Sequence, residues 1–325
     1  MDRMKFRTEV EVAPWHQKIN YNDTILSLGS CFATNIAERL AERKFCITAN
    51  PTGILFNPAS IAQGVDRIAQ CRMVDTADLF ESNGRWLSYD FHSSLSSSDK
   101  AETFNLINSR IATAHQLLRS ANHLIITLGT AWAYRLCSSN KVVANCHKQP
   151  HSLFHRELLR ADEILEALES IVASCSAHII LTVSPIRHMG EGVEDNSLSK
   201  ALLRVACEEL RMRHPERVTY FPSFEIMMDD LRDYRFYGDD LVHPSTMAVD
   251  YIVNKFFGAA LSDATQKRMA EVAKIVNAAN HRPQNPHSEQ HKAFCRHQLE
   301  LIEQIKDVDL QKEREYFERM LQINL

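Results

Sequence analysis

The sequence predicts an α/β fold, a three-layer α/β/α sandwich around a mostly parallel sheet. Four apolar segments of strand length alternate along residues 1–261 with amphipathic segments of helix length. Parallel strands need crossover connections, which are usually helices, so this alternation favours βαβ units. The predicted strands are residues 24–28, 124–128, 178–183 and 218–221.

The first predicted strand leads into a glycine turn and a helix. Residues 24–28 contain no charge, which is typical of a strand that is buried on both faces. Gly29 ends this strand. After it, apolar residues at 33, 36, 37, 40 and 41 recur at helical spacing, with charged residues on the opposite face. The segment is therefore a strand-turn-helix unit.

The later predicted strands are also followed by a residue that breaks regular structure, either glycine or proline. Gly129 follows the second, and Pro185 and Pro222 follow the third and fourth. Between the strands, apolar residues return every three or four positions, which predicts helices. These helices are residues 103–119, 161–174, 197–212 and 245–260.

The last part of the chain predicts helices without strands. Two polar, helix-patterned runs, 262–280 and 288–322, flank a break at residues 281–286 that contains two prolines. We therefore divide the chain into an α/β domain, 1–261, and a helical C-terminal extension, 262–325. We expect the extension to pack on the sandwich; covering the site and forming a homo-oligomer are the alternatives.

Composition excludes several classes of partner. The 325 residues are 45% hydrophobic and 24% charged, with a net charge of −4, so no electrostatic case exists for nucleic acid or an anionic membrane. Residues 1–14 hold no continuous apolar run, which argues against a secretory signal. The eight cysteines form no CxxC pair. We expect reduced thiols in a cytoplasmic protein without a membrane-spanning helix.

Two short stretches suggest a catalytic site. Ser30 and Cys31 lie where a strand ends and a helix begins, a position where ligands bind and where the helix dipole favours a thiolate. Far along the chain, Asp240 precedes His243 by three residues, so that its carboxylate can orient the imidazole. Together they predict a nucleophile, a base and the base's orienting group. The alternative is a helix-capping serine and a buried cysteine.

These stretches resemble the GSCFA domain family, whose naming motif stands unaltered at Gly29-Ser30-Cys31-Phe32-Ala33. The resemblance places the chain within the SGNH (GDSL-like) hydrolase superfamily and extends along most of its length. The other matching stretches begin at Phe6-Arg7-Thr8, Asn50-Pro51-Thr52-Gly53, Leu128-Gly129-Thr130, Asn145-Cys146-His147-Lys148, Ser184-Pro185-Ile186-Arg187-His188, Arg235-Phe236-Tyr237 and His281-Arg282-Pro283.

The resemblance implies roles for individual residues. The superfamily's first block is Gly-Asp-Ser, and an ungapped overlay places Cys31 at its nucleophilic serine; the rival register makes Ser30 the nucleophile. Gly53 resembles the glycine that donates an N–H to the oxyanion. The asparagine that the superfamily uses to bind the oxyanion is absent after residue 129. Either Thr130 donates in its place, or Asn145 from the following loop substitutes for it.

Further polar residues are candidates for substrate binding. Arg187 and His188 follow the third strand and therefore point to the same edge, where a cation suits a phosphate or carboxylate. His147 lies in a loop that either lines the pocket or is solvated. The sequence has no HExxH, paired CxxC, GxGxxG or P-loop motif, so we expect neither a metal nor a cofactor.

The leading hypothesis is an acyl hydrolase or acyltransferase that acts on an ester of a sugar or another small metabolite. The carbohydrate substrate follows only from the superfamily. The alternative is a non-catalytic small-molecule-binding module, or an interaction protein that uses its C-terminal helices. We expect neither a nucleic acid nor a membrane as partner.

Overall fold

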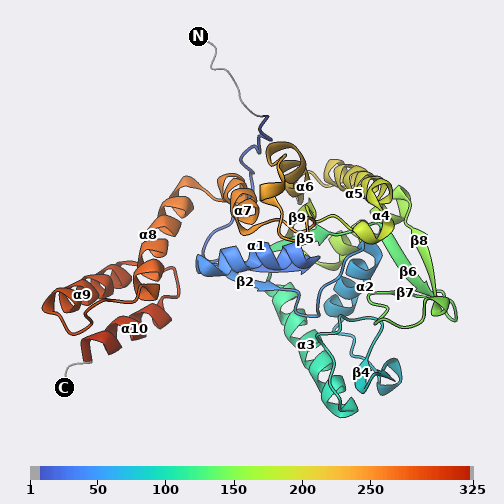
Figure 1. The fold of residues 1–325 in the computed structure, drawn as a ribbon, viewed down its shortest axis with the longest axis horizontal. Coiled ribbons are helices and arrows are strands. Elements are labelled where there is room, and N and C mark those ends of the chain that lie inside the picture. Colours follow the sequence, from blue (N-terminus) through green and yellow to red (C-terminus); the bar gives the residue numbers. More distant parts are fainter. Residues whose placement is uncertain (1–7, 323–325) are drawn as a thin grey trace, which may run out of the picture.

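The computed structural model describes residues 8–322 and shows a mixed α/β fold around a five-stranded parallel sheet (Figure 1). Its strand order is β10-β9-β5-β1-β2, and each neighbouring pair is parallel. The predicted fold class is confirmed. The strands are β1 (Thr24–Gly29), β2 (Cys46–Ala49), β5 (His123–Leu128), β9 (His178–Val183) and β10 (Val218–Phe221).

Of the five strands of this sheet, only β2 was not predicted from the sequence. It has four residues, forms one edge of the sheet and is only partly buried, so it lacks a continuous apolar signal. From β1 the chain passes to β2 on one side and later to β5 on the other side. The strand order therefore reverses at β1. In sheets of this kind, the crevice beside such a reversal is where ligands bind.

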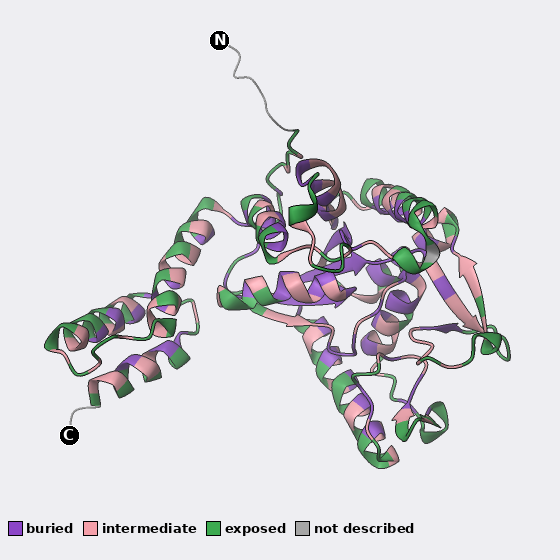
Figure 2. Cartoon of the chain, viewed as in Figure 1, coloured by how far each residue is buried: buried purple, intermediate pink, exposed green. Residues whose placement is uncertain are grey.

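Helices cover both faces of the sheet because the strand side chains alternate. Ile25, Ile125 and Ile180 belong to one hydrophobic core, and Leu26 and Ile126 belong to the other. Figure 2 shows the buried strands at the centre and exposed positions on the outer sides of the helices. The helices are α1 (Cys31–Glu42) and α7 (Thr246–Ala260) on the first core, and α2 (Pro58–Ala69), α4 (Ala161–Ser174) and α5 (Val193–Arg213) on the second.

Two antiparallel insertions were not predicted from the sequence. A hairpin, β3–β4, and a three-stranded sheet of order β7-β6-β8 interrupt the α/β pattern. Their strands have two to five residues and carry little apolar alternation. The strands of the insertions are β3 (Phe80–Ser82), β4 (Arg85–Leu87), β6 (Trp132–Leu136), β7 (Val142–Val143) and β8 (Phe154–Leu158). Helix α3 (Lys100–Ser120) lies between the two insertions in the sequence. Short helices in the connections are η1 (Thr76–Asp78), η2 (His151–Leu153), η3 (Met189–Glu191) and η5 (Tyr234–Phe236).

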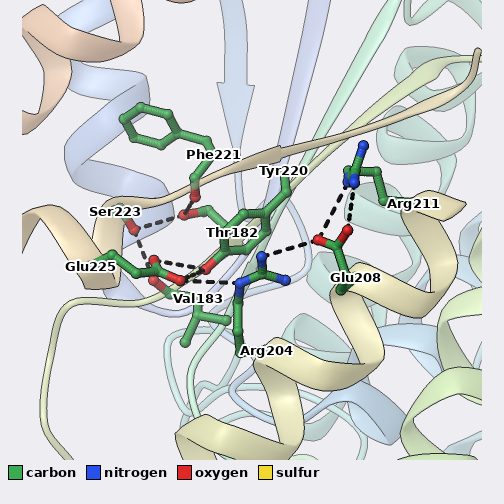
Figure 3. A network of polar contacts seen from close by, with 9 residues as sticks. All are labelled: Thr182, Val183, Arg204, Glu208, Arg211, Tyr220, Phe221, Ser223 and Glu225. Atoms are coloured by element: carbon green, nitrogen blue, oxygen red, sulfur yellow. Dashed lines mark hydrogen bonds and ion pairs between the residues drawn. The ribbon is translucent and has the colours of Figure 1, made fainter. Parts of the chain in front are cut away.

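A polar network holds the turn after β10 (Figure 3). The Tyr220 hydroxyl donates to the Glu225 carboxylate at 2.9 Å, and burial followed by this charge raises the pKa of Tyr220. The Arg204 guanidinium lies over the Tyr220 ring and pairs with Glu225 at 3.2 Å. Ser223 donates to the Val183 carbonyl at 2.8 Å. The network thus anchors α6 (Ser223–Glu225) and the π-helical η4 (Ile226–Asp230) to the carboxyl ends of β9 and β10.

Asp230, at the end of η4, ties the first described residues to α7. Its fully buried carboxylate accepts from the Val10 N–H at 2.5 Å and from the Tyr251 hydroxyl at 2.9 Å. The Lys255 ammonium lies 3.1 Å away and also donates to the Val10 carbonyl. One carboxylate therefore links the first described residues to two side chains of α7.

Replacing Asp230 with alanine is expected to lower the free energy of unfolding by about 3 kcal/mol, because it removes the carboxylate that accepts from Val10, Tyr251 and Lys255 in a partly buried cluster. Denaturant titration measures this change. Asp229→Ala is the matched control, because Asp229 forms an exposed pair with Arg232 and should change the free energy by less than about 0.5 kcal/mol. Equal effects of the two substitutions would contradict the account.

The C-terminal region is helical, as predicted, and extends from one side of the sandwich (Figure 1). Its hydrophobic residues, among them Val272, Ile302 and Phe317, continue the core of the α1 face. Lys44, between α1 and β2, pairs with the buried Glu313 at 2.7 Å. The helices are α8 (Asp263–Asn280), α9 (Glu289–Gln304) and α10 (Gln311–Gln322). Within residues 8–322, no helix is both long and apolar enough to cross a membrane.

Candidate active site

The β1–α1 turn is built around a glycine that no other residue can replace without strain. Gly29 has φ +131°, and a Cβ on it would lie 2.1 Å from the Thr127 carbonyl oxygen of β5. The Ser30 N–H donates to that same carbonyl at 3.0 Å, and the Gly29 N–H donates to the Asn50 side chain at 2.9 Å. The turn is therefore fixed between two strands, and it directs the first residue of α1 to the carboxyl edge of the sheet.

Cys31, His243 and Asp240 meet at this edge. The Cys31 thiol is half-buried, and its Sγ lies 3.9 Å from Nε2 of His243. Nδ1 of His243 lies 2.6 Å from Oδ2 of Asp240. A thiol, an imidazole and a carboxylate thus follow one another in contact, although 212 residues separate the cysteine from the histidine.

The carboxylate is held in position by its own loop. Oδ1 of Asp240 accepts the backbone N–H groups of His243 at 2.9 Å and Val242 at 3.0 Å. These bonds, with the His243 side chain, lower the pKa of Asp240 to about 2, so the group is ionised throughout the neutral range. An ionised Asp240 accepts a hydrogen bond from Nδ1–H of His243, and this bond leaves the unprotonated Nε2 facing the thiol.

The thiol is protonated in its resting state. Burial raises the pKa of Cys31, and this effect outweighs the N–H groups of Cys31 and Phe32 and the charge of Lys200, which act in the opposite direction. The sequence alone suggested a lowered pKa, because it shows the helix start but not the burial. A protonated thiol needs a base to react, and His243 lies beside it.

Ser30 occupies a different environment from Cys31. Its side chain is 1% exposed, does not cap α1, and has an Oγ without a hydrogen-bond partner within the described part of the chain. The side chain in contact with His243 is that of Cys31. The geometry thus favours the register in which Cys31 is the nucleophile.

Lys200 is a component that the sequence reasoning missed. It lies on α5, is 2% exposed, and donates to the carbonyls of Gly129 at 2.7 Å and Ser184 at 2.8 Å, just after β5 and β9. Burial lowers its pKa to about 7, while Cys31 acts to raise it and Arg187 to lower it further. The available signal was its spacing from Leu203 and Cys207, which puts a lysine on the buried face of the helix.

His188 lies beside the same strand end. Its ring meets Phe56 edge to face, and Nε2 would be 3.2 Å from a Cβ on Gly129. Nε2 is buried without a hydrogen-bond partner among residues 8–322. Burial, then Lys200 and His243, lower the pKa of His188 to about 4, so its ring is neutral near pH 7. Two of the predicted binding residues are therefore near the cluster, since Arg187 precedes His188 and lines the adjoining groove.

The predicted oxyanion donors have other partners in this structure. The Gly53 N–H donates to the Asn50 carbonyl at 2.8 Å, and a Cβ on Gly53 would lie 2.5 Å from that of His92. The Thr130 hydroxyl lies 3.1 Å from that of Ser199 and accepts the Trp132 N–H at 3.1 Å. The N–H groups of Cys31 and Phe32, at the start of α1, are alternative donors, because both act on the thiol and lower its pKa.

Asn145 and His147 belong to the antiparallel insertion. Nε2 of His147 lies 2.8 Å from the Ser88 carbonyl, and its backbone N–H donates to the Asn145 side chain at 2.8 Å. The His147 ring also contacts Phe80 and Tyr89. These contacts lie between the two small sheets and do not involve the Cys31 cluster.

Over residues 8–322, no three histidine, cysteine or acidic side chains gather as metal ligands would.

The fold and the cluster describe an α/β protein with a thiol, an imidazole and a carboxylate at the carboxyl edge of its parallel sheet. The chain belongs to the GSCFA family, whose model matches residues 24–256. The model of the GSCFA domain protein C-terminal domain matches residues 272–323. The resemblance carried by residues 29–33 is therefore confirmed at the family level; Phe6 and Arg7 of another matching stretch lie outside the described residues. No curated protein matches the chain.

Proposed function

We propose that this protein is an SGNH-like acyl hydrolase or acyltransferase with Cys31 as nucleophile, His243 as base and Asp240 as the group that orients the base. The proposal rests on one observation above all. The thiol contacts Nε2 at 3.9 Å while Nδ1 contacts the carboxylate at 2.6 Å, at the strand end where α/β sheets bind ligands. An ester of a sugar or another small metabolite follows from the superfamily analogy.

In the reaction, Nε2 of His243 takes the Cys31 proton as Sγ attacks the ester carbonyl carbon. The new carbon–sulfur bond forms a tetrahedral oxyanion, which the N–H groups at the start of α1 stabilise. The carbon–oxygen bond to the alcohol then breaks, and the imidazolium returns the proton to the leaving oxygen. Water or an acceptor hydroxyl attacks the thioester, gives its proton through His243 to Sγ, and releases the acid or the new ester.

A non-catalytic small-molecule-binding module is the second candidate. The bonds that engage Gly53 and Thr130 favour it, because they remove two donors that an esterase of this superfamily uses. The two functions differ in one measurable property. An enzyme forms a covalent thioester at Cys31, whereas a binding module leaves the thiol unmodified.

Intact-mass spectrometry after incubation with activated esters tests the proposal. The wild type and Ser30→Ala are expected to gain one acyl group, Cys31→Ala none, and His243→Ala only a small fraction in the same time. The thiol, rather than the serine hydroxyl, lies beside the base, which is why Ser30→Ala retains the reaction. Alkylation at the seven other cysteines is the internal control for thiol access.

Two results would count against this reading. An adduct that disappears in Ser30→Ala and remains in Cys31→Ala would make Ser30 the nucleophile. If no variant forms an adduct or turns over any ester, the binding module becomes the better account.

A further inference from the structure

A groove of about 730 Å³ opens beside the candidate catalytic loop. One wall is the segment after β9, with Arg187 and Met189, and the other is the segment that carries Leu241 and Asp240. Met228 of η4 also lines the groove. The groove shares Asp240 with the Cys31 cluster, and Val242, the residue before His243, also lines it, so a ligand bound in it lies beside the loop that carries the proposed base.

Apolar side chains line this groove in unusually exposed positions. Tyr234 is 75% exposed, Leu241 58% and Met189 43%. Leu241 also has φ +59°, a backbone region that disfavours a leucine. Its N–H donates to the Gly238 carbonyl at 2.9 Å, which holds this conformation. Apolar groups that stay exposed around a cleft next to candidate reactive groups are typical of a binding site for an apolar chain.

Arg187 is a cation of this groove that forms no ion pair with any side chain that the structure describes, although Asp233 and Asp240 also line the groove. The Arg187 guanidinium lies 2.9 Å from the Met228 sulfur, which is a weak acceptor. No carboxylate lies within ion-pair distance of Arg187 in the part of the chain that the structure describes. The other arginine of the groove, Arg232, is already paired with Asp229 at 2.9 Å. Arg187 therefore retains guanidinium N–H groups for an anionic ligand.

We propose that the groove binds an apolar chain of the substrate together with a carboxylate or phosphate that pairs with Arg187. This inference deepens the proposed function and rests on it, because it names the substrate class of the same site as an amphipathic, anionic ester. The negative charge has two sources: the far end of the acyl group, or a phosphate on the half that leaves. The chemistry at Arg187 is the same for both.

Two matched pairs of acyl donors locate the charge. Mono-4-nitrophenyl adipate and 4-nitrophenyl hexanoate differ by a carboxylate at the end of the acyl group. The hexanoyl thioesters of 4′-phosphopantetheine and of pantetheine differ by a phosphate on the leaving half. In one pair, the charged donor is expected to acylate Cys31 at least about tenfold faster than its neutral counterpart. Arg187→Met abolishes the preference, and Arg232→Met, the matched control, retains it.

A binding measurement separates failure of this inference from failure of the proposed chemistry. Calorimetry on Cys31→Ala compares hexanoate and hexyl phosphate with hexan-1-ol, and with acetate and methyl phosphate. At least one six-carbon anion is expected to bind about tenfold or more tightly than both the neutral alcohol and its short-chain counterpart. Arg187→Met removes the advantage over the alcohol.

Equal affinity for hexan-1-ol and the anions, or a preference that survives Arg187→Met, overturns the inference. Selective binding of the anions without acylation of Cys31 by any donor supports the groove and overturns the proposed chemistry. Acylation of Cys31 at equal rates by the charged and the neutral donors supports the proposed chemistry and overturns the inference about the groove.

Discussion

Replacement of His243 by alanine is expected to slow acyl transfer to Cys31 by about 10²- to 10⁴-fold. The physical reason lies in the state of the thiol. Burial raises the pKa of Cys31, so the resting group is protonated, and the substitution removes the imidazole that contacts Sγ. The rate of acyl-adduct formation, followed by mass spectrometry near pH 7, measures the effect.

Asp240→Asn tests the second contact of the same chain of groups. The backbone N–H groups of Val242 and His243 hold the amide oxygen of the asparagine, so its NH2 group faces Nδ1 and cannot accept from it. The imidazole therefore loses its fixed tautomer and its stabilisation as a cation. We expect the rate to fall by about 10²-fold or more, with the protein still folded. The controls are Asp239→Asn, at the exposed neighbouring position, and His297→Ala, an exposed histidine on α9. Wild-type rates in both His243→Ala and Asp240→Asn would remove the basis for the proposed mechanism.

Replacement of Lys200 by methionine is expected to change how the stability of the protein depends on pH. The folded state lowers the pKa of Lys200 from 10.5 to about 7 because the ammonium is fully buried. Between these two pH values the unfolded chain binds more protons than the folded chain. The free energy of unfolding therefore rises with pH in this window, and below pH 7 the desolvation of the charged lysine counts fully against folding.

The size of the effect follows from the same shift. Between pH 7 and 8.5, the lysine contributes an increase of about 2 kcal/mol to the free energy of unfolding. Lys200→Met lacks this contribution, so the difference between the two proteins, measured by denaturant titration, isolates it from other titrating groups. Lys274→Met, on a C-terminal helix, serves as the control. Parallel pH profiles of wild type and Lys200→Met would show that this lysine is not held in a lowered-pKa state.

The same variant has a readout in the candidate site. The charge of Lys200 acts to lower the pKa of Cys31, so its removal should shift the alkylation of that thiol by iodoacetamide to higher pH. Lys200→Arg keeps a cation and should restore part of the wild-type profile. The direction of this shift separates an electrostatic role from simple loss of packing.

The sequence alone determined the α/β fold class, four of the five strands of the parallel sheet, and membership of the GSCFA family. These features could be predicted because a buried strand and an amphipathic helix are local patterns, and because the motif at residues 29–33 is contiguous. The short edge strand β2 and the antiparallel insertions could not, because their stability comes from pairing with distant segments rather than from their own composition.

Only the tertiary structure decided which of the candidate residues share a site. It brings Cys31 to His243 across 212 residues and buries the Ser30 Oγ with no hydrogen-bond partner among residues 8–322. It also engages Gly53 and Thr130 in other bonds and leaves His147 in the insertion. It also reveals Lys200 behind the thiol and the groove at Arg187. Burial and hydrogen-bond partners are properties of packing between distant segments. For this reason burial sets the direction of the pKa shift of both Cys31 and Lys200, and for Cys31 it outweighs the opposing N–H groups of Cys31 and Phe32.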